Sequence, residues 1–211
     1  MNVLSRFLFL ALTLCAPIAQ AHPHVFVTTR LVLELNTDQE VTGVTMTWEY
    51  DDFFTLLIFE DMGLDPDADG VLSDRELDQL MGFDLIEWPE GFEGDLYLTS
   101  HGRKIEMPRP VPHDIAVRDG KIIATQKRSI PDVPADGLVI RQYDPTYYVA
   151  YDLSGGIEVP APCGVRIIAP DLEAAEAEIA RLSKQSQSGD VFMEVELGHL
   201  YASRAVVSCG G

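Results

Sequence analysis

The sequence predicts an α+β protein, mainly an antiparallel β-sheet or sandwich with an inserted EF-hand-like helix–loop–helix and one long helix in its C-terminal half. Three observations support this fold class. Apolar residues alternate along many short segments bounded by turn residues, as expected of half-buried strands. One acidic twelve-residue segment, 65–76, has the pattern of a calcium-binding loop. The Ala-rich stretch 171–185 is the one long helical pattern.

Residues 1–21 have the features of a cleaved secretory signal. Arg6 precedes an apolar segment at 7–15, and Ala-Gln-Ala at 19–21 is a cleavage site. The apolar segment is too short to anchor the chain in a bilayer. Removing 21 of the 211 residues leaves 190, which we interpret as one exported domain, 22–211, without membrane insertion.

The mature chain begins with two predicted strands that form a hairpin. Apolar residues alternate along 25–35 and again along 44–50, and the polar segment 36–40 joins the two. The second strand ends at Asp51 and leads directly into an apolar helix at 52–62. A register that pairs the two strands would bring Asp51 close to His24.

Residues 65–76 match the EF-hand loop at each constrained position. Gly70 permits the sharp turn, and a second helix is expected at 74–81, so the insertion spans about 52–82. The expected calcium ligands are the side chains of Asp65, Asp67 and Asp69, the main-chain carbonyl of Val71, Ser73 directly or through water, and both carboxylate oxygens of Glu76. The alternative is an acidic surface turn. A single hand outside the cytosol should have a dissociation constant on the order of 0.1–1 mM, which favours a structural role.

The rest of the chain is predicted to be mostly strands. An acidic connector, 82–95, precedes them, and Asp119-Gly120 is a type I′ turn signal. Strands are expected at 96–100, 104–107, 113–117, 122–129, 138–143, 147–153, 165–169, 191–197 and 201–209. The helix 171–185 is capped by Asp171 and ends before 186–190.

Two cysteines remain after the signal is removed, Cys163 and Cys209. In an oxidising exported compartment, such a pair is most simply one disulfide that ties the last strand to the middle of the domain. A two-thiolate metal site is the alternative reading.

Charge and motif content exclude several function classes. The formal charge of −19 becomes −20 when Arg6 is removed with the signal, so binding to nucleic acid is excluded. The sequence has no phosphate-binding glycine loop, nucleophile elbow, zinc-protease motif or Cys-x-x-Cys. We therefore do not expect an enzyme.

Cleavage after residue 21 makes His22 the new N-terminus, followed by Pro23 and His24. The α-amine and two imidazoles offer nitrogen ligands near neutral pH, suited to Zn²⁺, Ni²⁺, Co²⁺ or Cu²⁺. Pro23 has no amide N–H, so a square-planar chelate through backbone amides is blocked. The alternative is two exposed polar residues at a frayed terminus.

Four segments together resemble one known family. They are the start His-Pro-His-Val-Phe-Val at 22–27, Trp-Glu-Tyr-Asp-Asp-Phe at 48–53, the EF-hand-like loop, and Tyr-Asp-Pro-Thr-Tyr-Tyr at 143–148. The chain resembles the uncharacterised bacterial family described as the periplasmic component of an ABC-type transport system, often encoded beside nickel/cobalt-type permeases. The resemblance implies a periplasmic location and a role in transition-metal handling with an inner-membrane permease as partner.

The sequence therefore predicts a periplasmic metal-binding accessory protein, with Ca²⁺ bracing the insertion and a transition metal at His22 and His24. Two alternatives remain. A terminal histidine can form a copper brace for oxidative chemistry, which needs a third imidazole from His101, His113 or His199. The chain could instead be a calcium-stabilised interaction domain with no transition metal.

Overall fold

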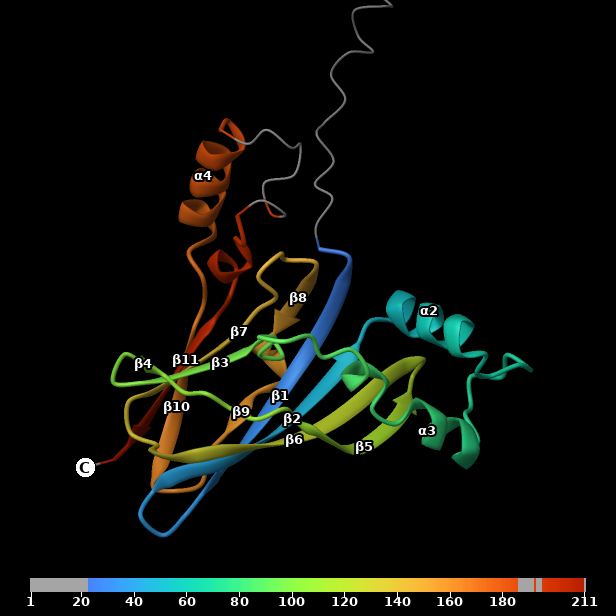
Figure 1. The fold of residues 1–211 in the computed structure, drawn as a ribbon, viewed down its shortest axis with the longest axis horizontal. Coiled ribbons are helices and arrows are strands. Elements are labelled where there is room, and N and C mark those ends of the chain that lie inside the picture. The colour runs from blue at the N-terminus through green and yellow to red at the C-terminus, as the bar shows by residue number, and fades with distance from the viewer. Residues whose placement is uncertain (1–22, 186–191, 193–194, 211) are drawn as a thin grey trace, which may run out of the picture.

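Two β-sheets form the body of the protein (Figure 1). The structure is a computed structural model that describes residues 23–185, 192 and 195–210. The predicted signal 1–21, His22 and the segment 186–190, which was predicted to end the long helix, lie outside the described residues. Strands and helices occur in the mixture that the sequence predicts, so the α+β class is confirmed.

The first sheet is built around the N-terminal hairpin. Its order is β5-β6-β2-β1-β8, and β9 also pairs with β1. Most neighbours are antiparallel, but β1 pairs in parallel with both β8 and β9. The bounds are β1 Val25–Leu35, β2 Glu40–Tyr50, β5 Val111–Arg118, β6 Lys121–Pro134, β8 Val149–Asp152 and β9 Ile157–Glu158.

The second sheet is antiparallel and has the order β10-β11-β7-β3-β4. The predicted disulfide is confirmed: Cys163 and Cys209 face each other across β10 and β11 and are bonded at 2.01 Å. It therefore joins two neighbouring strands of one sheet. The bounds are β3 Leu96–Ser100, β4 Arg103–Lys104, β7 Leu138–Gln142, β10 Cys163–Ile168 and β11 Arg204–Cys209.

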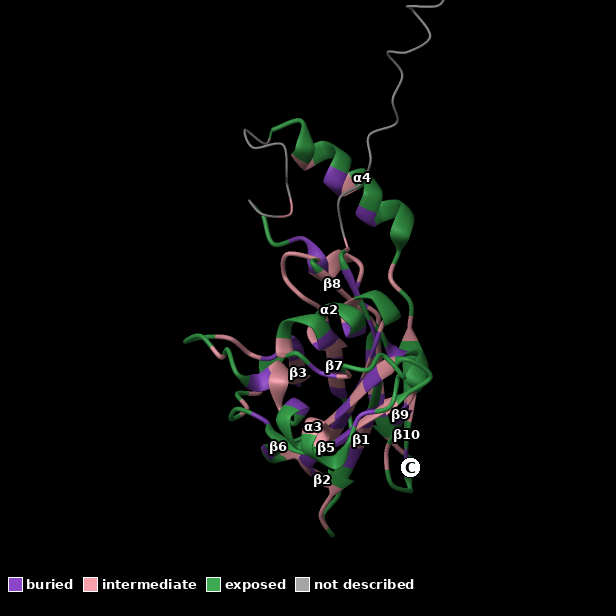
Figure 2. Ribbon diagram, turned by 90° about the vertical axis from the view of Figure 1, so that its right-hand side faces the viewer, coloured by how far each residue is buried: buried purple, intermediate pink, exposed green. Residues whose placement is uncertain are grey.

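One hydrophobic core is shared by the two sheets, as in a β-sandwich. The alternating residues of β1 and β2 supply its first half; Leu31 and Val41, for example, are fully buried. Leu98 and Ile140, from β3 and β7, belong to the same core. Figure 2 shows that much of the sheets is buried, whereas the helices and loops are mostly exposed.

The insertion consists of α2 (Asp52–Met62), the acidic loop and α3 (Asp74–Leu80). It projects from one side of the sheets (Figure 1). Phe59, Leu64, Leu72 and Leu80 are buried in the main core. The hydroxyl of Thr55 accepts a hydrogen bond of 3.0 Å from the backbone N–H of Ile122, in a buried position. The insertion is therefore fixed to the sandwich and is not a separate domain.

The C-terminal helix α4 (Leu172–Ser183) lies at the end of the molecule away from α3 (Figures 1 and 2). Asp171 caps it, as predicted, by accepting a hydrogen bond from the N–H of Ala174. Ile179 packs with Leu197 in a small cluster that is separate from the main core.

Two strand predictions need correction, and four short elements were not predicted. The segment 191–197 was expected to be a strand, but its described residues, 192 and 195–197, are not, because Leu197 packs against α4 instead of alternating across a sheet. The strand predicted at 104–107 is only β4, at 103–104. β9 and the short 3₁₀ helices at Phe83–Leu85, Leu153–Gly155 and Gly198–Leu200 were not expected. No helix in the described part of the chain is long and apolar enough to cross a membrane.

Candidate metal sites

The acidic loop begins where α2 ends. Gly63 adopts the left-handed conformation, with φ of 65°, and its N–H bonds back to the last turn of the helix. Leu64 is then buried, which fixes the entry of the chain into the loop. Gly70 also has a positive φ, of 77°, as the turn at loop position 6 requires.

Three aspartates come together in this loop. The ligand oxygens of Asp65, Asp67 and Asp69 all lie within 4.8 Å of one another. The Asp65 carboxylate also shapes the loop, since its two oxygens accept hydrogen bonds from the N–H groups of Asp69 and Gly70 at 3.0 and 3.1 Å. Three carboxylates this close repel one another unless a cation lies between them. Their oxygens are the donors that Ca²⁺ prefers.

Glu76 connects the end of the loop to its beginning through hydrogen bonds. One of its oxygens accepts the N–H of Asp65 at 3.0 Å, and the other accepts the N–H and the hydroxyl of Ser73 at 2.8 and 2.6 Å. The bond from the Ser73 N–H and the bond that the Ser73 hydroxyl accepts from the Glu76 N–H at 3.4 Å form a capping box at the start of α3. The hydrogen bonds from Ser73 lower the pKa of the Glu76 carboxyl. Glu76 thus joins loop positions 1 and 9 and stays ionised.

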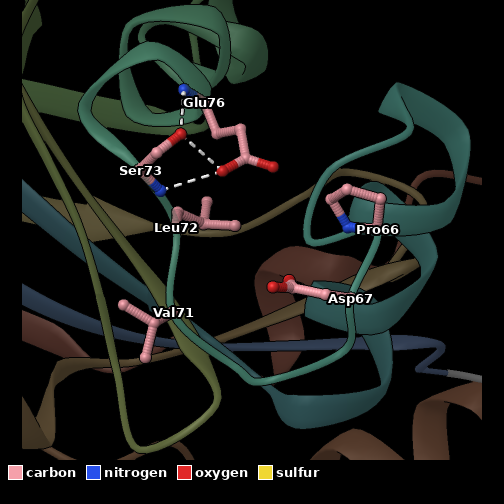
Figure 3. A pocket seen from close by; sticks show the side chains of 6 residues that line it. All are labelled: Pro66, Asp67, Val71, Leu72, Ser73 and Glu76. Carbon is pink, nitrogen blue, oxygen red and sulfur yellow. Dashed lines mark hydrogen bonds between the residues drawn. The ribbon is translucent and has the colours of Figure 1, made fainter.

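Figure 3 shows Asp67 and Glu76 on opposite arms of the loop, with their side chains directed into the same hollow. Val71 and Ser73 also line this hollow. The structure therefore places all six predicted calcium ligands around one loop. It brings three carboxylates into one cluster, while Glu76 is engaged by the backbone and by Ser73.

His24 lies just before β1 and is exposed. Its backbone N–H donates to the carbonyl of Tyr148 at 2.9 Å, and its imidazole lies 4.8 Å from the Tyr148 ring. The predicted partner His22 lies outside the described residues. Within the described residues, no group of three possible metal ligands includes His24.

Asp51 lies near the start of β1, as the predicted register required, but its carboxylate already has two partners. One oxygen accepts the N–H of Phe26 at 2.7 Å and the other caps α2 through the N–H of Phe54 at 2.9 Å. The role of Asp51 is therefore to connect β1 to the start of the insertion. Asp144 similarly folds its own turn, accepting the N–H groups of Thr146 and Val149.

The remaining histidines lie on other elements. His113 is exposed on β5, His101 lies in the β3–β4 turn, and the ring of His199 is 6.2 Å from the ring of Tyr143. Across the described ranges, none of them joins His24 in a ligand group.

Sequence reasoning missed two carboxyl groups in the connector 82–95, the half-buried Asp84 and the buried Asp95. The Oδ2 atom of Asp84 accepts hydrogen bonds from the Tyr50 hydroxyl at 3.1 Å and from the Gln126 amide at 2.5 Å. Asp95 accepts a bond of 2.9 Å from the Tyr151 hydroxyl. Burial raises the pKa of both carboxyl groups, that of Asp95 to about 7. The aromatic residues of the connector are the signal that could have indicated a packed site there.

Comparisons with known proteins place this chain in a protein family. The family described as "Protein of unknown function (DUF1007)" matches residues 7–209. A search of curated proteins finds no match. Two solved structures are similar at low level. Acetylcholine-binding protein type 1 of Biomphalaria glabrata is 12% identical, with 96% of this chain and 95% of that chain covered and a TM-score of 0.30. AChBP from Bulinus truncatus is 9% identical, with 96% of each chain covered and a TM-score of 0.29. These values carry no argument about fold or ligand.

Proposed function

Because this chain belongs to the family of proteins of unknown function (DUF1007), we propose its function from its own residues: it is a periplasmic metal-binding accessory protein that binds Ca²⁺ in the loop 65–76. The observation that carries the proposal is the cluster of Asp65, Asp67 and Asp69 within a complete EF-hand pattern.

Calcium has a structural task in this arrangement. The loop connects α2 and α3, which both pack against the sandwich, and Leu64 and Leu72 on its two arms are buried in the core. A cation between the arms offsets the repulsion of the three carboxylates and joins the arms through shared ligands. The bound ion thus stabilises the insertion relative to the unfolded chain.

A transition metal at His22 and His24 is the second part of the proposal. Support comes from the exposure of His24, its position before the first strand, and its backbone bond to Tyr148, which holds it in place. The formal charge of −19 attracts cations in general. The terminus supplies the α-amine and two imidazoles, and the metal remains exchangeable for delivery to, or removal from, an inner-membrane permease.

An accessory protein needs a surface for its partner, and α2 offers one. Phe53, Leu56 and Leu57 are 73%, 64% and 43% exposed, so the outer face of the helix is apolar. Exposed apolar patches of this kind are typical of interaction sites. The same surface also fits the alternative of a calcium-stabilised interaction domain, which differs only in lacking the transition metal.

The calcium site is tested by thermal unfolding with and without Ca²⁺. Asp67→Asn removes one ligand charge and disturbs no hydrogen bond recorded for the described residues. The matched control is Asp78→Asn, an exposed carboxylate on α3 outside the loop. At ten times the dissociation constant, Ca²⁺ should stabilise the wild type by about 1.4 kcal/mol, or roughly 3–6 °C.

We expect the control to keep this shift and Asp67→Asn to lose most of it. Equal shifts in all three proteins would contradict the calcium site.

The transition-metal site is tested by metal analysis of the secreted protein beside a variant with one Ala added before His22. Loss of the transition metal in the extended variant is the expected result; its absence from both proteins would leave a calcium-stabilised interaction domain.

A further inference from the structure

A cavity of about 380 Å³ lies apart from the calcium loop and shares no residue with it. Side chains from β1, β2, β8, α2 and the segment 83–92 line it. Its volume is in the range of small-molecule sites. In Figure 1, α2 follows the end of β2 and lies beside the first sheet.

Eight of the thirteen residues that line this cavity are aromatic, and five of their rings form one connected group around Trp48 and Tyr50. The Tyr50 ring lies 5.1 Å from Phe54 and 5.5 Å from Phe83, and Trp48 lies 5.4 Å from Tyr151. Aromatic faces carry negative electrostatic potential and attract cations. The wall therefore favours a ligand that combines apolar surface with positive charge.

The charges around the cavity select the same kind of ligand. Asp84 and Glu87 line it, and none of the thirteen described lining residues is basic. Asp84 is largely buried and both of its recorded side-chain hydrogen bonds come from neutral groups, Tyr50 and Gln126. An anion would be repelled here, and a purely apolar ligand would leave the carboxylate without a counter-charge. A bare divalent ion would find too few oxygen ligands in an aromatic wall.

We propose that this cavity binds a small organic cation of the alkylammonium class, with its charged group beside Asp84, Tyr50 and Phe83. Trp88 is less suited to hold that group, because the guanidinium groups of Arg109 and Arg128 already lie 5.5 and 5.8 Å from its ring centre. The ring of Trp88 instead contributes apolar wall.

Trp48 adds a preference for an acceptor atom on the ligand. Its side chain lines the cavity and is only 6% exposed, yet its indole N–H has no hydrogen-bond partner among the described residues. A buried N–H without a partner is destabilising, so a ligand oxygen that accepts it adds affinity. A cation with a nearby hydroxyl group meets both requirements.

The test compares two probes that differ in charge but hardly in shape, choline and 3,3-dimethylbutan-1-ol. Both tryptophans of the chain, Trp48 and Trp88, line the cavity, so intrinsic fluorescence reports directly on it. Titrations at constant ionic strength, repeated by calorimetry, give the two affinities. We expect choline to bind about tenfold more tightly than the neutral alcohol. Equal affinities, or no saturable choline binding up to about 50 mM, would overturn the proposal.

Variants locate the charge. Asp84→Asn should weaken choline about tenfold and leave the alcohol unchanged, while Glu90→Gln, an exposed residue of the same connector outside the lining, should change neither. Phe83→Leu, which removes a ring face but keeps Asp84, should also weaken choline selectively. Unchanged choline affinity in both Asp84→Asn and Phe83→Leu would refute the assignment. Calcium binding at Asp67 is expected to persist in every variant, so the two sites can fail independently.

Discussion

Asp95 illustrates how one side chain makes stability depend on pH. It is 6% exposed, and burial raises its pKa from the usual range to about 7, with the negative charge of Asp144 adding to the shift. A carboxyl whose pKa is raised on folding binds its proton more tightly in the native state. The contribution of Asp95 to stability is therefore greatest below about pH 4, where its carboxyl is also protonated in the unfolded chain, and this contribution falls as the pH rises to about 7.

We predict that Asp95→Asn flattens this dependence. The amide oxygen can still accept the Tyr151 hydroxyl, and no charge needs to be buried at neutral pH. Burying the Asp95 charge should cost the wild type up to about 4 kcal/mol between pH 4 and 8, and the variant should lack this cost, as measured by urea unfolding of both proteins at each pH. Asp132→Asn, an exposed carboxyl on β6, is the control and should follow the wild type. If Asp95→Asn retains the full wild-type slope, the Asp95 carboxyl is not the cause.

Thr55 gives a second prediction at this scale. Its hydroxyl accepts the N–H of Ile122 in a buried position, and it is 1% exposed. Thr55→Val keeps the shape but leaves that N–H without a partner, which should lower the free energy of unfolding by about 1–3 kcal/mol. Thr55→Ser keeps the acceptor and loses only a methyl group, so it should cost about 0.8 kcal/mol. Equal losses in the two variants would show that packing, not the hydrogen bond, holds α2 on the sheet.

Among the elements, those with strong local signals could be predicted from the sequence. α2 has the predicted bounds because Asp51 caps its start and Gly63 ends it. β1 has the predicted bounds because apolar residues alternate along its whole length. The ligand loop was also accessible, since its oxygen donors lie within twelve residues of one another. Each of these features is encoded by neighbours in the chain.

Other features depend on distant partners and could not be predicted in this way. β9 has only two residues and exists because Leu31 and Val32 pair with it. The alternation at 191–197 resembled a strand, but Leu197 serves the packing of α4. The aromatic cavity draws its wall from segments as far apart as Val25 and Tyr151, so the aromatic residues of the connector indicate packing there but not which other segments complete the wall.

At the scale of the whole molecule, the disulfide links the last two strands of the second sheet, β10 and β11. Cys163 and Cys209 are separated by 46 residues, and the segment between them contains α4 and its small cluster. Replacing both cysteines by Ala should lower the free energy of unfolding by about 4 kcal/mol, because the unfolded chain without the cross-link gains conformational freedom. Chemical unfolding of the oxidised wild type beside the double variant measures this difference, and the reduced wild type is the control without the bond. An oxidised wild type no more stable than the double variant would contradict it.

The parallel pairing of β1 with β8 and β9 also determines when the first sheet is completed. β2 follows β1 directly, so a local hairpin covers one edge of β1. The other edge is covered by β8 and β9, which come much later in the chain. Arg30 of β1, for example, is paired with Glu158 of β9, 128 positions away. Contacts between such distant residues form late and slow the folding of a domain. A chain in the process of synthesis therefore presents an open strand edge, able to pair with other chains, until about three-quarters of it has emerged. Pairing with other chains at this edge is therefore avoided if the first sheet folds only after Glu158 has emerged.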